Sequence, residues 1–317
     1  MIEIALHLSS EDLGPTELVD AARAAEEAGL DTVTISDHYH PWHERQGSSP
    51  FVWSVIGGIA AATERLRVIS AVTCPTVRTH PAIIAQAAAT SAVMLEGRFV
   101  LGVGTGESLN EHILGDHWPP APVRLEMLTE AVEVMRLLWQ GGEQSHDGQH
   151  YLVENARVWN LPDDPVPVWV SAFGPLAMDV AVDIGDGYVG TTPDADLVGD
   201  YKQRSGGSPA VALGKCVWDA DVDTARRRLF QTWPNIGLPG ELAQILPTTT
   251  HFEQAVELVS QDDVADGVPC GPDPEVFAES IGEYAEAGYD IVSLHHVGDD
   301  QAGFVKFLTE EVMPLVE

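Results

Sequence analysis

Apolar, β-prone segments alternate eight times with helical patterns along this chain of 317 residues. Nearly all of these segments are continuous apolar runs, which is typical of strands buried on both faces of a parallel sheet. They cover residues 2–8, 32–36, 66–72, 98–104, 166–172, 187–191, 210–218 and 289–296. Eight βα units in this length predict an α/β protein with a (β/α)8 TIM-barrel fold. The alternative, a doubly wound sheet, usually has a glycine-rich fingerprint after its first strand, whereas HLSSEDLGPT follows here.

We expect residues 1–317 to form a single TIM-barrel domain with two insertions. Residues 141–164 contain Asp-Gly between alternating runs, which predicts a small hairpin. Residues 232–272 form a longer insertion between the seventh and eighth strands. Long insertions in a barrel commonly form the wall or the lid of its site.

The charge of the chain is strongly negative, because 49 acidic residues face 16 basic ones and the net charge is −33. Such a surface repels nucleic acid and anionic membranes, so we expect neither as a partner. Regular apolar periodicity argues against disorder. The remaining interpretation is a halophilic surface, on which carboxylates repel one another in dilute buffer and are screened at molar salt.

Cysteine usage and the ends of the chain favour a cytoplasmic protein. Cys74, Cys216 and Cys270 are few, odd in number and far apart, so they fit neither a disulfide framework nor a zinc ribbon. No run of 18 apolar residues is present, and the start of the chain lacks the basic segment of a signal peptide.

Residues 34–44, TISDHYHPWHE, place three histidines directly after the second strand, where barrel enzymes carry their chemistry. A metal site is the less favoured interpretation, because Pro41 breaks any rigid scaffold and no partner ligand pair stands at the other strand ends. A polar loop without chemistry is the second alternative. Catalytic use of at least one histidine is the interpretation we favour, and His40 and His43 are expected at the pocket mouth or in solvent.

Two further strand ends carry candidate site residues. The fourth strand runs into GVGTGE, whose glycines we expect to let the backbone approach a flat ligand. Glu107 follows, and we expect burial to raise its pKa into the range of a proton donor. The fifth strand ends in SAFGPLA, where Gly174 and Pro175 start a helix whose free N–H groups suit a phosphate.

The stretches SDHYHPW, GVGTGESLNE and SAFGP, in this order, resemble the luciferase-like monooxygenase superfamily. More narrowly, they resemble its branch of coenzyme F420-dependent oxidoreductases, which includes the F420-dependent glucose-6-phosphate dehydrogenases. The resemblance covers essentially the whole chain. It implies a bacterial-luciferase-like barrel, a homodimer, a small-molecule substrate and coenzyme F420, with FMN as the alternative cofactor.

The resemblance also implies roles for individual residues. His38 would be the base that takes the substrate's hydroxyl proton, Trp42 would shield the reacting centre, and Glu107 would protonate the deazaflavin. A non-proline cis peptide would join Ala71 and Val72. The residues implied for cofactor binding are Asp37, Cys74, Thr105, Gly106, Asn110, Phe173, Gly174, Leu176 and Ala177, with Cys74 standing where a threonine is usual. The chemistry agrees, since removing a hydride from an alcohol leaves a proton for a base of pKa near 7.

The sequence departs from the sugar-phosphate members of this branch, in which lysine and arginine side chains hold the substrate phosphate. Asp194, Asp266 and Asp290 stand at about those places, and neither residues 191–197 nor residues 261–268 contain a basic side chain. Like charges in a partly desolvated pocket repel by several kcal/mol, roughly. The sequence therefore predicts a neutral alcohol or sugar as substrate. The alternatives are a sugar-phosphate dehydrogenase, an FMN-dependent monooxygenase and a non-catalytic flavin-binding barrel.

Overall fold

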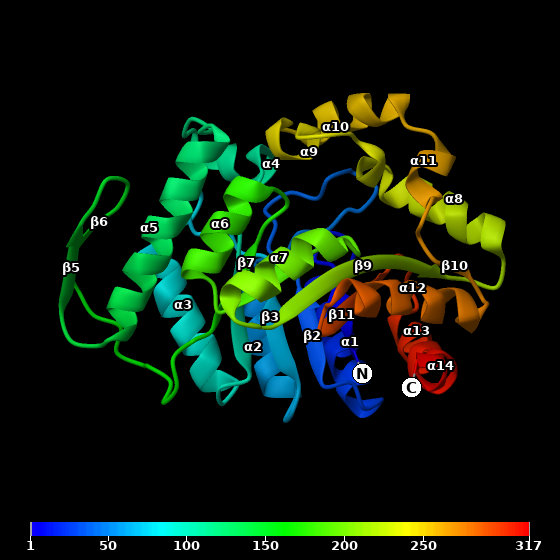
Figure 1. Cartoon of the computed structure of the whole chain (residues 1–317), viewed down its shortest axis with the longest axis horizontal. Helices are drawn as coiled ribbons and strands as arrows, with labels where there is room; N and C mark the ends of the chain where they lie inside the picture. Colours follow the sequence, from blue (N-terminus) through cyan, green and yellow to red (C-terminus); the bar gives the residue numbers. More distant parts are fainter. Residues whose placement is uncertain (1, 317) are drawn as a thin grey trace.

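Eight parallel strands close into a barrel, and helices surround it (Figure 1). The computed structural model describes residues 2–316. In order around the barrel the strands are β1 (Glu3–Leu8), β2 (Thr32–Ile35), β3 (Arg67–Ser70), β4 (Phe99–Val103), β7 (Val168–Ser171), β8 (Gly187–Gly190), β9 (Ala210–Trp218) and β11 (Ile291–His296). Pairing of β11 with β1 and of β8 with β9 completes the closure. The TIM-barrel prediction is confirmed, and each apolar run contains one strand.

Helices cover the outside of the barrel, one or more after each strand. Those of the barrel wall are α1 (Pro15–Glu27), α2 (Val52–Ala62), α3 (Pro81–Met94), α5 (Ala121–Trp139), α6 (Pro175–Ile184), α7 (Ala195–Ser205), α8 (Val222–Thr232), α12 (Pro274–Ala287), α13 (Gln301–Phe307) and α14 (Met313–Val316). Sequence analysis left α12 unassigned, although Asp273 caps its start by accepting from the Glu275 N–H. Within residues 2–316 no helix has the length and apolarity to cross a membrane.

Residues 234–265, which we call the lid, lie above the C-terminal ends of the strands (Figure 1). The lid consists of short helices: η2 (Pro234–Gly237), α9 (Leu242–Ile245), α10 (Thr249–Ala255), η3 (Val256–Leu258) and α11 (Gln261–Ala265). Phe252 and Val264 of the lid share a small core with Trp42, Leu109 and Trp233. Apolar packing therefore fixes the lid to the loop after β2 and to the end of α8. After the lid, β10 (Cys270–Gly271) adds to β9.

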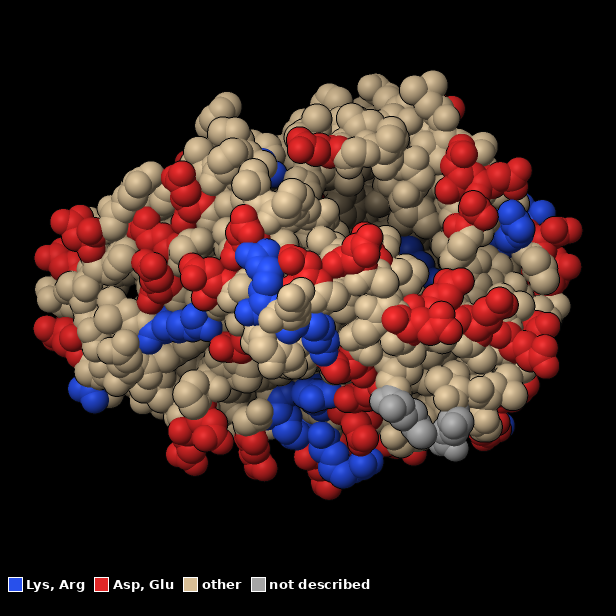
Figure 2. Space-filling view, viewed as in Figure 1, with Lys and Arg blue, Asp and Glu red and all other residues tan. Residues whose placement is uncertain are grey.

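Acidic side chains are spread over the face of the molecule drawn in Figure 2, and basic side chains gather in a few places. Several of the basic residues are already paired. Arg204 contacts Asp179 at 2.7 Å and Asp200 at 2.9 Å, and Lys202 pairs with Asp290. Since 49 acidic residues share 16 basic ones, most carboxylates cannot each have a basic partner, and their charges repel one another.

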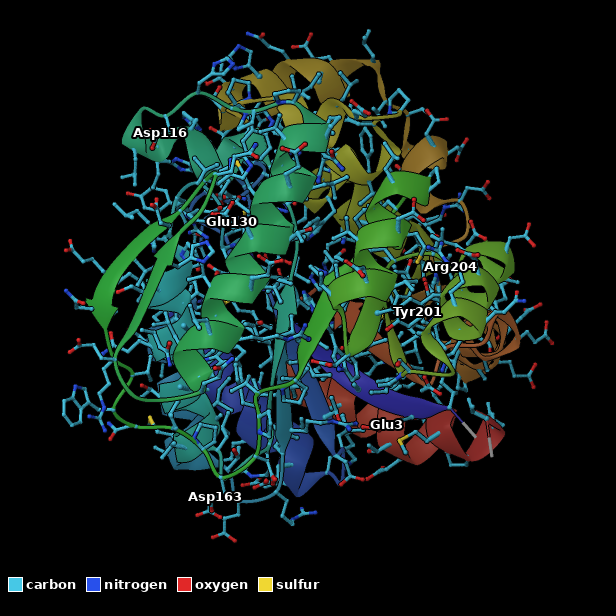
Figure 3. All side chains as sticks on the ribbon, turned by 60° about the vertical axis from the view of Figure 1, so that its left-hand side comes forward. Glu3, Asp116, Glu130, Asp163, Tyr201 and Arg204 are labelled. Carbon is cyan, nitrogen blue, oxygen red and sulfur yellow. The ribbon has the colours of Figure 1, made fainter. Side chains whose placement is uncertain are left out.

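A hairpin of β5 (Gln144–Asp147) and β6 (Leu152–Ala156) runs beside α5, the helix that carries Glu130 (Figure 3). The Glu130 carboxylate accepts hydrogen bonds from the backbone N–H groups of His150 (3.0 Å) and Tyr151 (2.8 Å). The Tyr151 hydroxyl donates to the carbonyl oxygen of Thr76 at 3.0 Å. These bonds attach the hairpin both to α5 and to the loop after β3.

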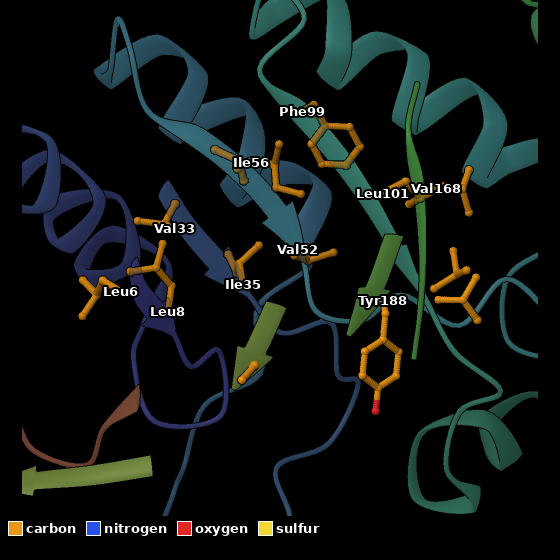
Figure 4. Packing of buried hydrophobic residues seen from close by; sticks show 14 of the residues in the cluster. Leu6, Leu8, Val33, Ile35, Val52, Ile56, Phe99, Leu101, Val168 and Tyr188 are labelled. Carbon is orange, nitrogen blue, oxygen red and sulfur yellow. The ribbon is translucent and has the colours of Figure 1, made fainter. Parts of the chain in front are cut away.

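Alternation along each strand divides the core into an outer and an inner layer. Leu6, Leu8, Val33 and Ile35 face the helices and pack there with side chains such as Ile56 (Figure 4). The intervening positions face the barrel axis, where Ala5, Ile69, Val100, Trp169, Val189, Val211 and Ile291 form an apolar inner cluster. Toward the C-terminal ends the inner positions become polar, and this change sets the depth at which chemistry begins.

Candidate active site

A cavity of about 590 Å³ opens beneath the lid at the C-terminal ends of the strands. Figure 2 shows its mouth as a hollow below the arch of the lid. Its walls come from the loops after β1, β2, β3, β4, β7 and β8, from the middle of β9, from β11 and α12, and from the lid. The volume lies within the usual range for small-molecule sites.

Most of the site residues expected from the sequence meet at this cavity. Those that line it are Asp37, His38, Trp42, Cys74, Gly106, Glu107 and Phe173. Asn110 is buried and joins them through hydrogen bonds. Thr105, Gly174, Leu176 and Ala177 are not among the lining residues. The start of α6 instead forms an exposed rim, with Phe173 58% and Leu176 63% exposed.

Asn110 ties the loop after β2 to the loop after β4. Its Oδ1 accepts from the backbone N–H groups of Tyr39 (2.9 Å) and His40 (3.0 Å), so the amide orientation is determined. Its Nδ2 then points toward Glu107 Oε2 at 3.3 Å and toward His38 Nδ1 at 3.0 Å. His38 Nδ1 also lies 3.3 Å from the His40 carbonyl oxygen, and the ring tautomer decides which of its two contacts is the hydrogen bond.

Glu11, which sequence analysis did not assign, faces His38 from the loop after β1. His38 Nε2 lies 3.4 Å from Glu11 Oε1, and the hydroxyls of Ser9 (2.9 Å) and Ser36 (2.6 Å) donate to Glu11 Oε2. Burial acts to raise the pKa of Glu11, but His38 and the Ser36 hydroxyl outweigh it, and the pKa is lowered. Glu11 is therefore an ionised carboxylate beside the predicted base.

A second buried ionic group lies behind the loop after β4. The guanidinium Nη2 of Arg78 contacts Asp37 Oδ1 at 3.1 Å. The backbone N–H of Arg78 donates to Glu111 Oε2 at 2.7 Å. Burial raises the pKa of Glu111 to about 7, although the charge of Arg78 opposes this. We expected such burial at Glu107, but Glu107 is only partly buried, and the fully buried carboxyl of this loop is Glu111.

The glycines of GVGTGE allow close packing at the end of β4. A Cβ at Gly102 would lie 1.9 Å from the Ser70 carbonyl oxygen, one at Gly104 2.8 Å from Val72 Cγ2, and one at Gly106 2.5 Å from Cys74 Sγ. The glycines therefore let the end of β4 pack against residues 70–74, rather than only approach a ligand. That segment contains the cis peptide between Ala71 and Val72 that the resemblance implied.

The three histidines of the loop after β2 point to different surroundings. His38 lines the cavity, and its ring lies 5.0 Å from the ring of Trp42. His40 is partly exposed, with its ring 6.2 Å from that of His112. His43 was expected at the mouth or in solvent, but it is 2% exposed and packs under Phe252 of the lid.

Acidic residues outnumber basic ones around the cavity. Of the three aspartates expected there, Asp266 lines it, whereas Asp194 caps α7 and Asp290 pairs with Lys202. Among the described residues that line the cavity, Lys215 is the single lysine or arginine. The lining carboxylates are Glu11, Asp37, Glu107, Glu111, Asp263 and Asp266.

Comparisons with known proteins agree with this geometry. The model of the luciferase-like monooxygenase family matches residues 1–290. The chain is 34% identical to an F420-dependent glucose-6-phosphate dehydrogenase of Nocardia farcinica, across 99% of this chain and 97% of that protein. A protein of the same description from Microbacterium testaceum is also 34% identical, across 96% and 95%. A solved F420-dependent secondary alcohol dehydrogenase, in complex with an F420-acetone adduct, matches with a TM-score of 0.90 at 28% identity and covers 100% and 99% of the two chains.

Proposed function

Since the chain belongs to the luciferase-like monooxygenase family, we propose that it transfers a hydride between a neutral alcohol or sugar and coenzyme F420. It is an oxidoreductase, as are the F420-dependent dehydrogenases that it matches over nearly their whole length. The observation that carries the proposal is the position of Asn110. Its side chain accepts from the backbone N–H groups of Tyr39 and His40, directly after His38, and donates to Glu107 Oε2, so it ties the loop of the base to the loop of the acid at one cavity.

The residues at the strand ends fit a deazaflavin cofactor. Gly106 and Cys74 both line the cavity, and burial raises the pKa of the Cys74 thiol well above its ordinary value, so a neutral thiol would face the cofactor. Within residues 2–316 no side chain caps the start of α6 at Gly174, so the N–H groups that follow Pro175 would be available to the cofactor phosphate. When bound, the deazaflavin accepts the hydride from the substrate carbon. Asp37, held by Thr73 Oγ1 at 2.9 Å, would contact its ring.

His38 is the proposed base. A proton on Nδ1, donated to the His40 carbonyl oxygen, leaves a lone pair on Nε2. Nε2 then takes the proton of the substrate hydroxyl as the hydride leaves the carbon that bears it. The resulting imidazolium faces the Glu11 carboxylate, which stabilises its positive charge. Trp42, 9% exposed and in contact with the lid, keeps water from this side of the reaction.

Glu107 is the proposed proton donor to the cofactor. Its carboxyl lines the cavity at the start of α4 (Ser108–Glu111), and Asn110 Nδ2 donates to its Oε2. A proton given up here neutralises the negative charge that develops on a ring that gains a hydride. The acid and the base thus lie on separate loops, and the reaction requires no proton transfer between them.

Binding of cofactors tests this proposal most directly. The protein, in molar KCl, is titrated with F420 and with FMN while cofactor fluorescence is followed. We expect F420 to bind more tightly. Stoichiometric, tighter binding of FMN would instead favour an FMN-dependent monooxygenase.

An F420-dependent sugar-phosphate dehydrogenase is the second candidate, because two curated relatives carry that description and Lys215 lines the cavity. The excess of lining carboxylates argues against a phosphorylated substrate, because a phosphate would meet like charges there. The rate of F420 reduction by glucose and by glucose 6-phosphate, at equal ionic strength, separates the two. A clear preference for the phosphate ester would establish the second candidate.

A further inference from the structure

We propose that Lys215 is a specificity residue whose ammonium binds a second, uncharged oxygen of the substrate, so that the preferred substrates are polyols or sugars rather than simple alkyl alcohols. This inference rests on the function proposed above and deepens it. The sequence alone indicates no function for Lys215. The inference depends on the environment of the Lys215 ammonium inside the cavity.

Lys215 projects from the inner face of β9. Val211 and Leu213 lie on the same face of this strand, four and two residues before Lys215. Both belong to the apolar inner cluster. Lys215 is the next inner position and is paired in register with His295 of β11. Its side chain therefore rises from the apolar floor into the cavity that it lines.

The ammonium of Lys215 has an aromatic neighbour but no hydrogen-bond acceptor. Its Nζ lies 4.1 Å from the centre of the Trp233 ring, a cation–π contact. Among residues 2–316 no hydrogen bond is made by Nζ, and no carboxylate oxygen lies within 4.0 Å of it. N–H donors of the ammonium are therefore available to a ligand in the cavity that Lys215 lines.

The two nearest carboxylates balance the charge of Lys215 without satisfying its donors. Glu11 and Asp12 both favour its charged form, against burial, which lowers its pKa. Glu11 is engaged by Ser9, Ser36 and His38, as described above. Asp12 accepts from Trp233 Nε1 at 2.9 Å and lies 2.8 Å from His295 Nε2.

An ammonium with available donors beside two carboxylates favours an uncharged oxygen as its ligand. An anionic group at Lys215 would add to a neighbourhood that already holds two carboxylates and one ammonium. A hydroxyl oxygen accepts from the ammonium without adding charge. A substrate without a second oxygen leaves the donors unpaired in a partly desolvated place, which disfavours its binding.

Glu11 connects Lys215 to the reacting centre, since it faces His38 on one side and acts on Lys215 on the other. A substrate whose first hydroxyl reaches His38 thus has its remaining carbons near Lys215. A hydrogen bond to a charged donor should change kcat/KM by about 10- to 100-fold.

The test uses matched pairs of alcohols that differ by one hydroxyl: 2-propanol with 1,2-propanediol, and 2-butanol with 1,3-butanediol. Lactate supplies the same secondary alcohol with a carboxylate. F420 reduction is measured with wild-type protein, Lys215→Met, Lys215→Gln and the surface control Lys306→Met. Melting temperature and F420 affinity report whether each variant is folded. If Lys215→Met does not fold, Lys215→Gln takes its place in the comparison with wild type.

We expect the wild type to prefer at least one diol over its mono-alcohol by about 10- to 100-fold. Lys215→Met should abolish that ratio, Lys215→Gln should retain part of it, and Lys306→Met should leave it intact. An equal ratio in wild type and Lys215→Met, or no preference for either diol, would overturn the proposal. So would a Lys215-dependent preference for lactate, because it would make Lys215 an anion site.

Failure of the proposed function gives a different result from failure of this inference. If neither these alcohols nor glucose reduces F420, the function proposed above is wrong, and calorimetry then measures binding of the same alcohols to the F420-loaded protein. A diol preference in Kd that Lys215→Met removes would still support the function of Lys215. Equal affinities for diol and mono-alcohol would overturn it.

Discussion

Burial of the Glu111 carboxyl should make the free energy of unfolding fall as pH rises, and Glu111→Gln should remove this dependence. Its carboxyl is 1% exposed, and burial raises its pKa from an ordinary 4.5 to about 7. Between these values the folded protein holds a proton that the unfolded chain releases. The free energy of unfolding therefore falls as pH rises through this window, and the loss is about 2–3 kcal/mol between pH 5 and pH 8.

Glu111→Gln keeps the shape of the neutral carboxyl but has no proton to lose. Relative to wild type, this variant should gain about 2–3 kcal/mol between pH 5 and pH 8. The assay is denaturant unfolding at several pH values in molar KCl, so that surface repulsion changes little. Glu286→Gln, on the exposed side of α12, controls for the loss of a charge. A stability difference that stays constant from pH 5 to pH 8 would refute the reasoning, because it would mean that Arg78 keeps Glu111 ionised throughout.

Three further predictions concern catalysis, salt and substrate. His38→Ala and Glu107→Gln should each lower turnover about 10²- to 10⁴-fold while cofactor binding changes less, and near-normal rates in His38→Ala would move the test to His40. With a net charge of −33, the melting temperature should rise steeply from dilute buffer to molar KCl, and a flat profile would show that the acids are already paired or well spaced. Glucose should exceed glucose 6-phosphate in kcat/KM at equal ionic strength; the opposite order would reveal a cationic pocket.

Sequence analysis located the site because its strongest signals are local. The end of a strand is visible in a single segment, and in a barrel every such end lies at the same face. His38, Trp42 and Glu107 stand just beyond strand ends, and all three line the cavity. The cis peptide between Ala71 and Val72 came from the resemblance, and the structure contains it.

Three polar residues of the site region were not found in this way. Glu11 and Arg78 also follow strand ends, but nothing in their own segments indicates that they face His38, Asp37 or Glu111. Glu111 is more deeply buried than Glu107 and contacts Arg78, and both properties depend on what packs around a residue. The sequence analysis therefore expected the raised pKa at Glu107.

The sequence predicts the barrel, because eight continuous apolar runs separated by helical patterns are typical of a parallel sheet covered by helices, and no glycine-rich fingerprint of a doubly wound sheet follows the first run. It also determined the acidic character of the surface and the strand ends that carry chemistry. The electrostatics of the cavity, in contrast, arise from tertiary contacts. Lys215 becomes an inward-facing cation because barrel closure sets β9 beside β11 and brings Glu11, Asp12 and Trp233 around it. Charge interactions act across space between segments far apart in the chain, so their balance exists only once the fold has closed.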